Sequence, residues 1–266
     1  MKKFKTVYYV AFLAVLVSCA TVPLTGRKQI SLVGDSEVNT SAAQSYRQLL
    51  SDPATKVIKG TDDAQRVKRV GDQLATAIEG YLKANGYGDQ YHFQWEFNLI
   101  QSKEVNAWCM PGGKVAVYSG ILPITMDDAG LATVMGHEIG HAIARHSAER
   151  ISQQRAAQAG GALVGVASSN KSSTTQAIVN QLYGVGGQLV LLKYSRNQES
   201  EADRLGLTFM AMAGYDPNSA VLFWQRMAAQ NKGGAPPEFL STHPADETRI
   251  QDIKNRIPEA MKYYHH

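Results

Sequence analysis

Two histidines four residues apart, with a glutamate directly after the first, are the side chains of this sequence best placed to do chemistry. They are His137, Glu138 and His141, in the pattern His-Glu-x-x-His. Residues four apart on a helix share one face, so both imidazoles can reach a single metal ion. Zinc binds imidazole nitrogen readily, and a catalytic zinc keeps one position for a water whose pKa falls to about 7. Glu138 could take the proton of that water and pass it to a leaving amine.

Acidic residues further along the chain can supply the third metal ligand. In the segment 195–206, Glu199 and Asp203 are four residues apart and therefore share a helical face. A carboxylate at Glu199 completes a His-His-Glu site for one zinc ion per subunit. Asp203, one turn later, can accept a hydrogen bond from the outer nitrogen of a ligating histidine and so fix its tautomer. Glu201 competes for the ligand role, but its spacing from Asp203 places it on another face, so we favour Glu199.

The elements that must position these residues are helices. Around the His-Glu-x-x-His pattern, apolar side chains recur at helical spacing, and Asp127 and Asp128 suit an N-cap and a first turn. The apolar stripe consists of Leu131, Ala132, Val134, Ile139, Ala142 and Ile143. We therefore predict a helix that carries both histidines and Glu138, and a second helix over 195–206.

Periodicity predicts the other elements around these two helices. They are helices over about 35–50 and 61–84, strands over 91–100 and 114–118, and helices around 220–227 and 244–257. Residues 156–192 are rich in small and polar side chains, and we interpret them as an insertion between the two ligand-bearing helices. Its ends are expected to pack and its serine-rich middle to be disordered. The predicted fold class is α+β, mainly helical, with a small sheet beside the active-site helix.

The first residues predict a bacterial lipoprotein signal peptide. A basic start is followed by an apolar run that is shorter than the about 20 residues of a membrane-spanning helix. The run ends in Leu16-Val-Ser-Cys19, which resembles the lipoprotein cleavage site, so Cys19 is the predicted lipidation site and membrane anchor. Ala20 is not an acidic retention residue, which favours the periplasmic face of the outer membrane. An ordinary secretory signal with a chance cysteine is the alternative.

Length and composition suit one globular domain behind this signal. The chain has 266 residues, of which 44% are hydrophobic, enough to bury a core. We divide it into a signal peptide over 1–18, a lipid-anchored tether that leads into the domain over 19–34, and a metallopeptidase domain over 35–266. Without the three lysines of the signal, 24 basic side chains face 23 acidic ones, a net charge of +1. This balance gives no argument for a nucleic-acid partner.

Three other residues that could do chemistry are interpreted as structural. Only two cysteines occur, so an acylated Cys19 leaves Cys109 without a partner in the chain. We expect Cys109 to be a small buried side chain rather than a nucleophile, and no disulfide. His92 and His146 are read as structural histidines. His265 and His266 are read as the remnant of a tag.

Several motifs together resemble the gluzincin metallopeptidases related to HtpX and the CaaX prenyl protease. The resemblance is to their soluble, lipoprotein-anchored periplasmic branch, typified by BepA and LoiP. It rests on Val22–Lys28, Asn106–Gly113, the helix of His137, Ser195–Arg204, and Ser241–Pro244 with Arg249. The resemblance implies a zincin-like domain and a zinc endopeptidase with Glu199 as the third ligand.

The resemblance also implies where a substrate binds. In zincins an extended substrate pairs with a strand edge beside the active-site helix, and the strand over 114–118 is the counterpart suggested here. Its predicted substrate-binding residues are Lys114, Val115, Ala116 and Val117. Main-chain pairing would let such an enzyme cut many sequences. The alternative is an interior strand with no role in binding.

His243 is the second predicted catalytic residue. It precedes Pro244, which presets the first turn of a helix, and in relatives a histidine here approaches the metal. It could occupy the open zinc position as a latch, or donate a hydrogen bond to the oxyanion. A helix-capping surface histidine is the alternative.

These inferences lead to one predicted function and two alternatives. The leading hypothesis is a zinc-dependent endopeptidase that hydrolyses misfolded or misassembled cell-envelope proteins. The first alternative is a chaperone-like outer-membrane assembly factor with a mostly latched zinc site, and the second is a structural zinc module. Glu138 argues against both alternatives, because a structural site needs no base. The expected partners are protein or peptide substrates, the membrane, and envelope assembly machinery.

Overall fold

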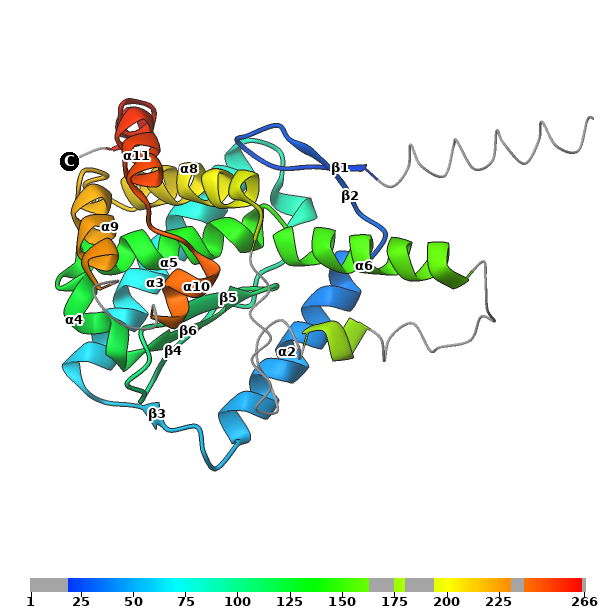
Figure 1. Cartoon of the computed structure of the whole chain (residues 1–266), viewed down its shortest axis with the longest axis horizontal. Helices are drawn as coiled ribbons and strands as arrows, with labels where there is room; N and C mark the ends of the chain where they lie inside the picture. The colour runs from blue at the N-terminus through cyan, green and yellow to red at the C-terminus, as the bar shows by residue number, and fades with distance from the viewer. Residues whose placement is uncertain (1–18, 163–174, 180–193, 231–236, 265–266) are drawn as a thin grey trace, which may run out of the picture.

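The computed structural model describes residues 19–162, 175–179, 194–230 and 237–264 (Figure 1). Two long helices run side by side through its centre, α5 (Asp128–Ile143) and α8 (Arg196–Met212). A small sheet lies on one side of this pair. The predicted α+β class, mainly helical with a small sheet, is confirmed.

Helix α5 forms where the sequence predicts it. The Asp127 carboxylate accepts a hydrogen bond from the backbone N–H of Gly130 at 2.7 Å and caps the N-terminus. Nearly all of the helix is buried, because other elements cover it on every side. The helix ends before Arg145, whose backbone adopts a left-handed φ of 55°. Both histidines of the motif therefore lie in the last two turns of a buried helix.

Glycines let α5 and α8 approach each other closely. A Cβ atom on Gly206 would lie 2.8 Å from the backbone nitrogen of His137, and one on Gly140 would lie 2.8 Å from the carbonyl oxygen of Ala202. No larger residue fits at either position without a shift of backbone. This close packing brings the acidic face of α8 directly against the histidines of α5.

The sheet contains four strands in the order β3-β4-β6-β5. They are β3 (Val57–Ile58), β4 (Glu96–Ile100), β5 (Ala107–Met110) and β6 (Lys114–Tyr118). Strands β4 and β6 are parallel, and the other two pairings are antiparallel. Alternate residues face two cores: Val115 and Val117 pack with the helices on the α5 side, and Ala116 faces the opposite side.

The prediction that 114–118 forms an exposed sheet edge is wrong. Strand β6 pairs with β4 on one side and with β5 on the other, so its backbone groups are occupied on both sides. Lys114, Val115, Ala116 and Val117 therefore cannot offer their main chain to a substrate. Among the described strands, β5 forms the edge of the sheet on that side.

The predicted strand over 91–100 is half right. Only Glu96–Ile100 forms a strand, and its partner β6 begins at Lys114, directly after the turn formed by Gly112 and Gly113. Before Glu96, the backbone N–H of Gln94 donates to the carbonyl of Gly112 at 2.9 Å, which belongs to this turn and not to a strand. The aromatic rings of 91–97 instead stack in a row, with Phe93 and Trp95 only 4.4 Å apart between centroids.

The remaining helices surround the sheet and the central pair (Figure 1). They include α2 (Asp35–Ser51), α3 (Asp62–Ala84), α4 (Leu122–Thr125), α6 (His146–Ala162), α9 (Ser219–Ala229), α10 (Glu238–Thr242) and α11 (Glu247–Ala260). Short 3-10 turns span Gly88–Gln90, Ser119–Ile121 and Met261–Tyr263. The helices predicted over about 35–50 and 61–84 are confirmed as α2 and α3.

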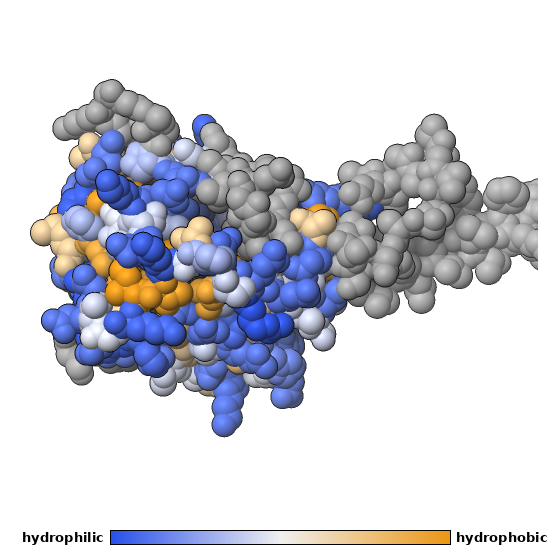
Figure 2. Space-filling view, turned by 90° about the horizontal axis from the view of Figure 1, so that it is seen from below, coloured by the Kyte–Doolittle hydropathy of each residue, from blue (hydrophilic) through white to orange (hydrophobic). Residues whose placement is uncertain are grey.

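An N-terminal hairpin completes the described fold. Its strands are β1 (Cys19–Thr21) and β2 (Lys28–Ile30), and Cys19 pairs with Ile30. The chain turns between them at Leu24 and Gly26, both with positive φ. Within the described ranges, no helix has the length and apolarity needed to cross a bilayer. The surface seen from below is mostly hydrophilic, with an apolar area in its left half (Figure 2).

Candidate metal centre

Four buried side chains from three parts of the chain converge beside the C-terminal half of α5. They are His137 and His141 from α5, Glu199 from the first turn of α8, and His243, which directly follows α10. One donor atom from each lies within 4.8 Å of all the others. Nε2 of His137 is 3.1 Å from Nε2 of His141 and 3.2 Å from Nδ1 of His243. Nδ1 of His243 is 2.9 Å from Oε1 of Glu199.

These separations fit a tetrahedral zinc ion. Ligand distances of about 2.0–2.1 Å place neighbouring donors of a tetrahedron about 3.3–3.4 Å apart. Five of the six separations between donor residues run from 2.9 to 3.5 Å, and the sixth, between His141 and His243, is no more than 4.8 Å. Three imidazoles and one carboxylate are also ligands that zinc accepts. The described residues could therefore hold zinc with His137, His141 and Glu199, and with His243 in the fourth position.

Glu138 lies against this donor set without being part of it. Its side chain is buried, and Oε1 has no hydrogen-bond partner. That oxygen lies 3.5 Å from Nε2 of His243. Burial raises the pKa of Glu138 to about 7. A buried carboxyl group with a free oxygen, beside the donors, is chemically able to exchange a proton with a group bound there.

Asp203 and Arg249 hold His137 from behind. Oδ1 of Asp203 is 2.9 Å from Nδ1 of His137, so Nε2 remains directed at the other donors. Arg249 donates to both carboxylate oxygens of Asp203, at 2.7 and 2.9 Å, and its guanidinium lies over the ring of Trp224. Burial opposes ionisation of Asp203, but Arg249 and His137 outweigh it and lower its pKa.

Arg249 also touches the donor set itself. Its Nη1 is 3.1 Å from Oε2 of Glu199. Burial disfavours the Glu199 carboxylate, but the neighbouring His243 and His137 hold its pKa well below the usual range. Sequence reasoning gave Arg249 no role in the site. Its position in the Ser241–Arg249 motif was the only signal available.

Glu201 lies outside the donor set, on another face of α8, as its spacing from Asp203 indicated. Its carboxylate contacts Nε2 of His146 at 3.0 Å, and it accepts hydrogen bonds from Thr25 and Arg27 of the N-terminal hairpin. Nδ1 of His146 in turn lies 2.8 Å from Nδ1 of His141. His146 is therefore connected to the centre, which sequence reasoning missed.

Tyr194 is a further residue that sequence reasoning missed. Its ring stacks on that of His141, with the centroids 4.0 Å apart, and Arg150 lies over its other side. Tyr194 precedes α8 in an irregular segment, where no periodic pattern could single it out. Its ring forms part of the wall that surrounds the metal ligands.

Strand β5 packs against α5, the helix that carries the general-base candidate Glu138. Burial and the charge of Glu138 raise the pKa of the Cys109 thiol well above its ordinary value. Cys109 is buried, as expected. The predicted substrate strand β6 lies one strand further from α5 along the sheet.

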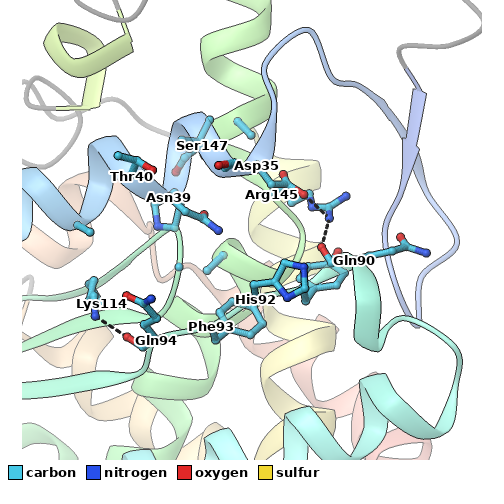
Figure 3. Close-up of a pocket in the computed structure, with 18 of the residues that line it drawn as sticks. Asp35, Asn39, Thr40, Gln90, His92, Phe93, Gln94, Lys114, Arg145 and Ser147 are labelled. Atoms are coloured by element: carbon cyan, nitrogen blue, oxygen red, sulfur yellow. Dashed lines mark hydrogen bonds and ion pairs between the residues drawn. The ribbon is translucent and has the colours of Figure 1, made fainter.

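A cavity of about 400 Å³ adjoins the centre at His141 (Figure 3). Its walls come from α2, the aromatic segment 91–94, the turn after β5 and the end of α5. Arg145 donates to the carbonyl of Gln90 at 2.9 Å, and Lys114 donates to the carbonyl of Gln94 at 2.5 Å. His92 lines the same cavity and is exposed. The cavity provides space for a bound chain next to a metal-ligand candidate.

Some predictions lie outside the described residues. They are the signal over 1–18, most of the insertion within 156–192, and the last two histidines. The lipidation candidate Cys19 is the first described residue and opens β1.

Comparison with known proteins gives consistent family matches. The model of peptidase family M48 matches residues 62–257. The mitochondrial metalloendopeptidase OMA1 of Schizosaccharomyces pombe is 32% identical over 241 residues, covering 90% of this chain and 67% of its own length. The beta-barrel assembly-enhancing protease of Yersinia pestis is 32% identical over 198 residues, covering 72% of this chain and 38% of that protein. Its counterpart in Escherichia coli is 32% identical over 179 residues, covering 65% and 36%.

Some of these relatives are considerably longer than the matched region, and the chain spans between 36% and 67% of the three proteins named. They include both mitochondrial and bacterial proteins, so the matches do not single out the bacterial lipoprotein branch. The family model nevertheless covers most of the chain, including all four donor residues and Glu138. The chain belongs to peptidase family M48.

Proposed function

We propose that this protein is a zinc-dependent endopeptidase. The observation that carries the proposal is the buried donor set of His137, His141 and Glu199. Beside it lies a carboxyl oxygen of Glu138 that has no hydrogen-bond partner among the described residues. Zinc bound there would supply an activated water and polarise the peptide carbonyl. A purely structural site would need no buried base next to its ligands.

The chain's own residues can then be assigned roles in peptide hydrolysis. Glu138 takes a proton from the attacking water and delivers it to the leaving amine. Asp203 holds the outer nitrogen of His137, at 2.9 Å, and so keeps its inner nitrogen unprotonated and able to bind metal. Arg249 neutralises part of the negative charge of Asp203 and Glu199.

The substrate is proposed to be an extended polypeptide. No described strand pairs with the outer side of β5, which is the sheet edge nearest to α5. An extended chain added there would make main-chain hydrogen bonds that depend little on its sequence. This assignment replaces the predicted role of β6. It suits an enzyme that cuts misfolded proteins of many sequences.

The proposed setting is the bacterial cell envelope, with the protein lipid-anchored at Cys19 to the periplasmic face of the outer membrane. The signal-like residues ending in Leu16-Val-Ser-Cys19 support this setting. The names of the bacterial relatives as beta-barrel assembly-enhancing proteases are compatible with it. The proposed substrates are misfolded or misassembled envelope proteins, and the domain over 35–266 would carry the activity.

A second candidate function is favoured by one observation. Nδ1 of His243 completes the donor set, so a fourth protein ligand can occupy the position that a catalytic water needs. A protein held in this state would act as an assembly factor whose peptidase activity is mostly latched.

Metal analysis combined with a cleavage assay tests the proposal. The purified protein should contain one zinc ion per chain and cleave an unfolded protein such as casein. Removing zinc with a chelator should stop cleavage, and adding zinc back should restore it. A metal-free protein that cleaves casein, or a zinc-loaded protein that never does so even after His243→Ala, would contradict the peptidase assignment.

A further inference from the structure

A series of polar contacts connects the ligand candidate His141 to the N-terminal hairpin. Nδ1 of His141 lies 2.8 Å from Nδ1 of His146, and Nε2 of His146 lies 3.0 Å from Oε2 of Glu201. Glu201 accepts hydrogen bonds from Oγ1 of Thr25 and Nε of Arg27, both at 2.6 Å. His141, His146 and Glu201 are each no more than 8% exposed. His146, Glu201, Thr25 and Arg27 have no role in the peptide hydrolysis proposed above.

The positions of the ring nitrogens fix the direction of these hydrogen bonds. Nε2 of His141 faces the donor set, so a metal-binding His141 carries its ring hydrogen on Nδ1. That hydrogen is donated to Nδ1 of His146. The hydrogen of His146 is then on Nε2, where it is donated to Glu201. A carboxylate only accepts hydrogen bonds, so Glu201 permits a single tautomer for each of the two rings, His146 and His141.

Backbone strain occurs at two points next to this series. Arg145, directly before His146, has φ 55°, and Leu24, directly before Thr25, has φ 67°. A left-handed conformation is disfavoured for residues with a side chain. At Arg145 it turns the chain between α5 and α6 so that His146 faces back toward His141. At Leu24 it shapes the loop that presents Thr25 and Arg27 to α8.

We propose that His146 and Glu201 are positioning residues for the metal ligand His141, and that Thr25 and Arg27 hold Glu201 for this purpose. The proposal rests on the proposed metal binding. It gives each ligating histidine of α5 its own buried carboxylate, Asp203 for His137 and Glu201 for His141. It also makes the hairpin that begins at Cys19 a part of the metal centre. Displacement of the hairpin would release Glu201 and weaken metal binding.

Zinc affinity measured against a chromophoric chelator tests each link. Loss of such an outer partner typically weakens metal binding about 10–100-fold. We expect this loss for His146→Ala, for Glu201→Ala and, to a smaller extent, for Arg27→Ala. The matched control is Glu149→Gln, which removes the negative charge that Arg27 contacts at 3.0 and 3.1 Å and leaves Glu201 intact. Its zinc affinity should equal that of the wild type.

A double variant distinguishes positioning from independent structural roles. If Glu201 acts through His146, then His146→Ala with Glu201→Ala should lose no more zinc affinity than His146→Ala alone. The visible spectrum of the cobalt-substituted protein should change in the same variants, because it reports ligand geometry. Additive losses of zinc affinity, or unchanged affinity in both single variants, would overturn the proposal.

A measurement on the wild-type protein covers the case in which the alanine variants do not fold. Nitrogen NMR of the histidine rings in the zinc-loaded protein should show a scalar coupling between Nδ1 of His141 and Nδ1 of His146. Absence of that coupling would overturn the proposal. Failure of the peptidase assignment is a different result, because it would appear as missing zinc or missing cleavage in the wild type itself.

Discussion

Replacing His243 with alanine separates a latch from a catalytic donor, because the two roles predict opposite changes in rate. Nδ1 of His243 lies 2.9 and 3.0 Å from the two carboxylate oxygens of Glu199 and 3.2 Å from Nε2 of His137. A latch binds through Nδ1, so this nitrogen must leave the donor set before water can take the fourth position. We take the cost of leaving to be that of breaking a hydrogen bond to a charged group, about 1.5–3 kcal/mol. The open state would then be about 10- to 150-fold less populated than the closed one.

His243→Ala should therefore raise casein cleavage by up to the same factor, while zinc content stays at one ion per chain. An oxyanion donor predicts the reverse, a loss of about 10²–10³-fold in kcat. Zinc X-ray absorption should show one fewer nitrogen ligand if His243 is a latch. Lys254→Ala, which changes an exposed residue of α11 away from the cavity and the donor set, is the control. An unchanged rate with unchanged coordination would refute both roles and leave His243 as a helix-flanking residue.

The remaining predictions concern the third ligand, the anchor and the pH dependence of stability. Glu199→Ala should lose stoichiometric zinc, whereas Glu201→Ala and Asp203→Ala should keep it with affinity lowered about 10–100-fold; metal analysis that ranks Glu201 above Glu199 would reverse the ligand assignment. Cys19→Ser should release soluble protein or leave an uncleaved precursor, and membrane fractionation that is unaffected by the change would refute the anchor. A hydrogen bond from Arg204 lowers the pKa of Glu259, so the contribution of this carboxylate to stability is complete above about pH 4.3 and is lost as the pH falls through its lower folded pKa. Both partners are about a third exposed, so Glu259→Gln should lower the free energy of unfolding by no more than about 1 kcal/mol at neutral pH. Denaturant titrations should show this difference vanish once the pH is below the lowered folded pKa, and a difference that grows on acidification would contradict this.

Local patterns in the sequence predicted the helices and the residues on them. The His-Glu-x-x-His spacing and the spacing of Glu199 from Asp203 are each properties of a single helix. Both could therefore be recognised from a local segment of the sequence, without knowledge of the rest of the fold. The close approach of α5 and α8 was not visible in this way. It depends on Gly140 and Gly206, which matter only once the two helices meet.

The order of the strands could not be predicted from the same patterns. Strand β5 has four buried residues and therefore shows no alternation of polar and apolar side chains. Without β5, the strand over 114–118 looked like an edge. Pairing between distant segments decides which strand is central, and a single sequence does not contain that information locally.

Contacts between distant segments also explain the site residues that were missed. Arg249 reaches Glu199 and Asp203 from the last helix, and Tyr194 stacks on His141 from an irregular segment. His146 was read as structural because its partners Glu201 and His141 come together only in the folded protein. In each case the residue type is compatible with a role in the metal centre, but the sequence alone does not show that the residue lies close to the ligand candidates.

The most direct test of the proposed chemistry is Glu138→Gln, measured beside the wild type for zinc content and casein cleavage. The substitution keeps the shape of the side chain, and Glu138 is not among the four donor residues, so zinc should remain at one ion per chain. Loss of the general base should lower the cleavage rate about 10²–10⁴-fold or more. Undiminished cleavage by a zinc-loaded Glu138→Gln protein would contradict the account.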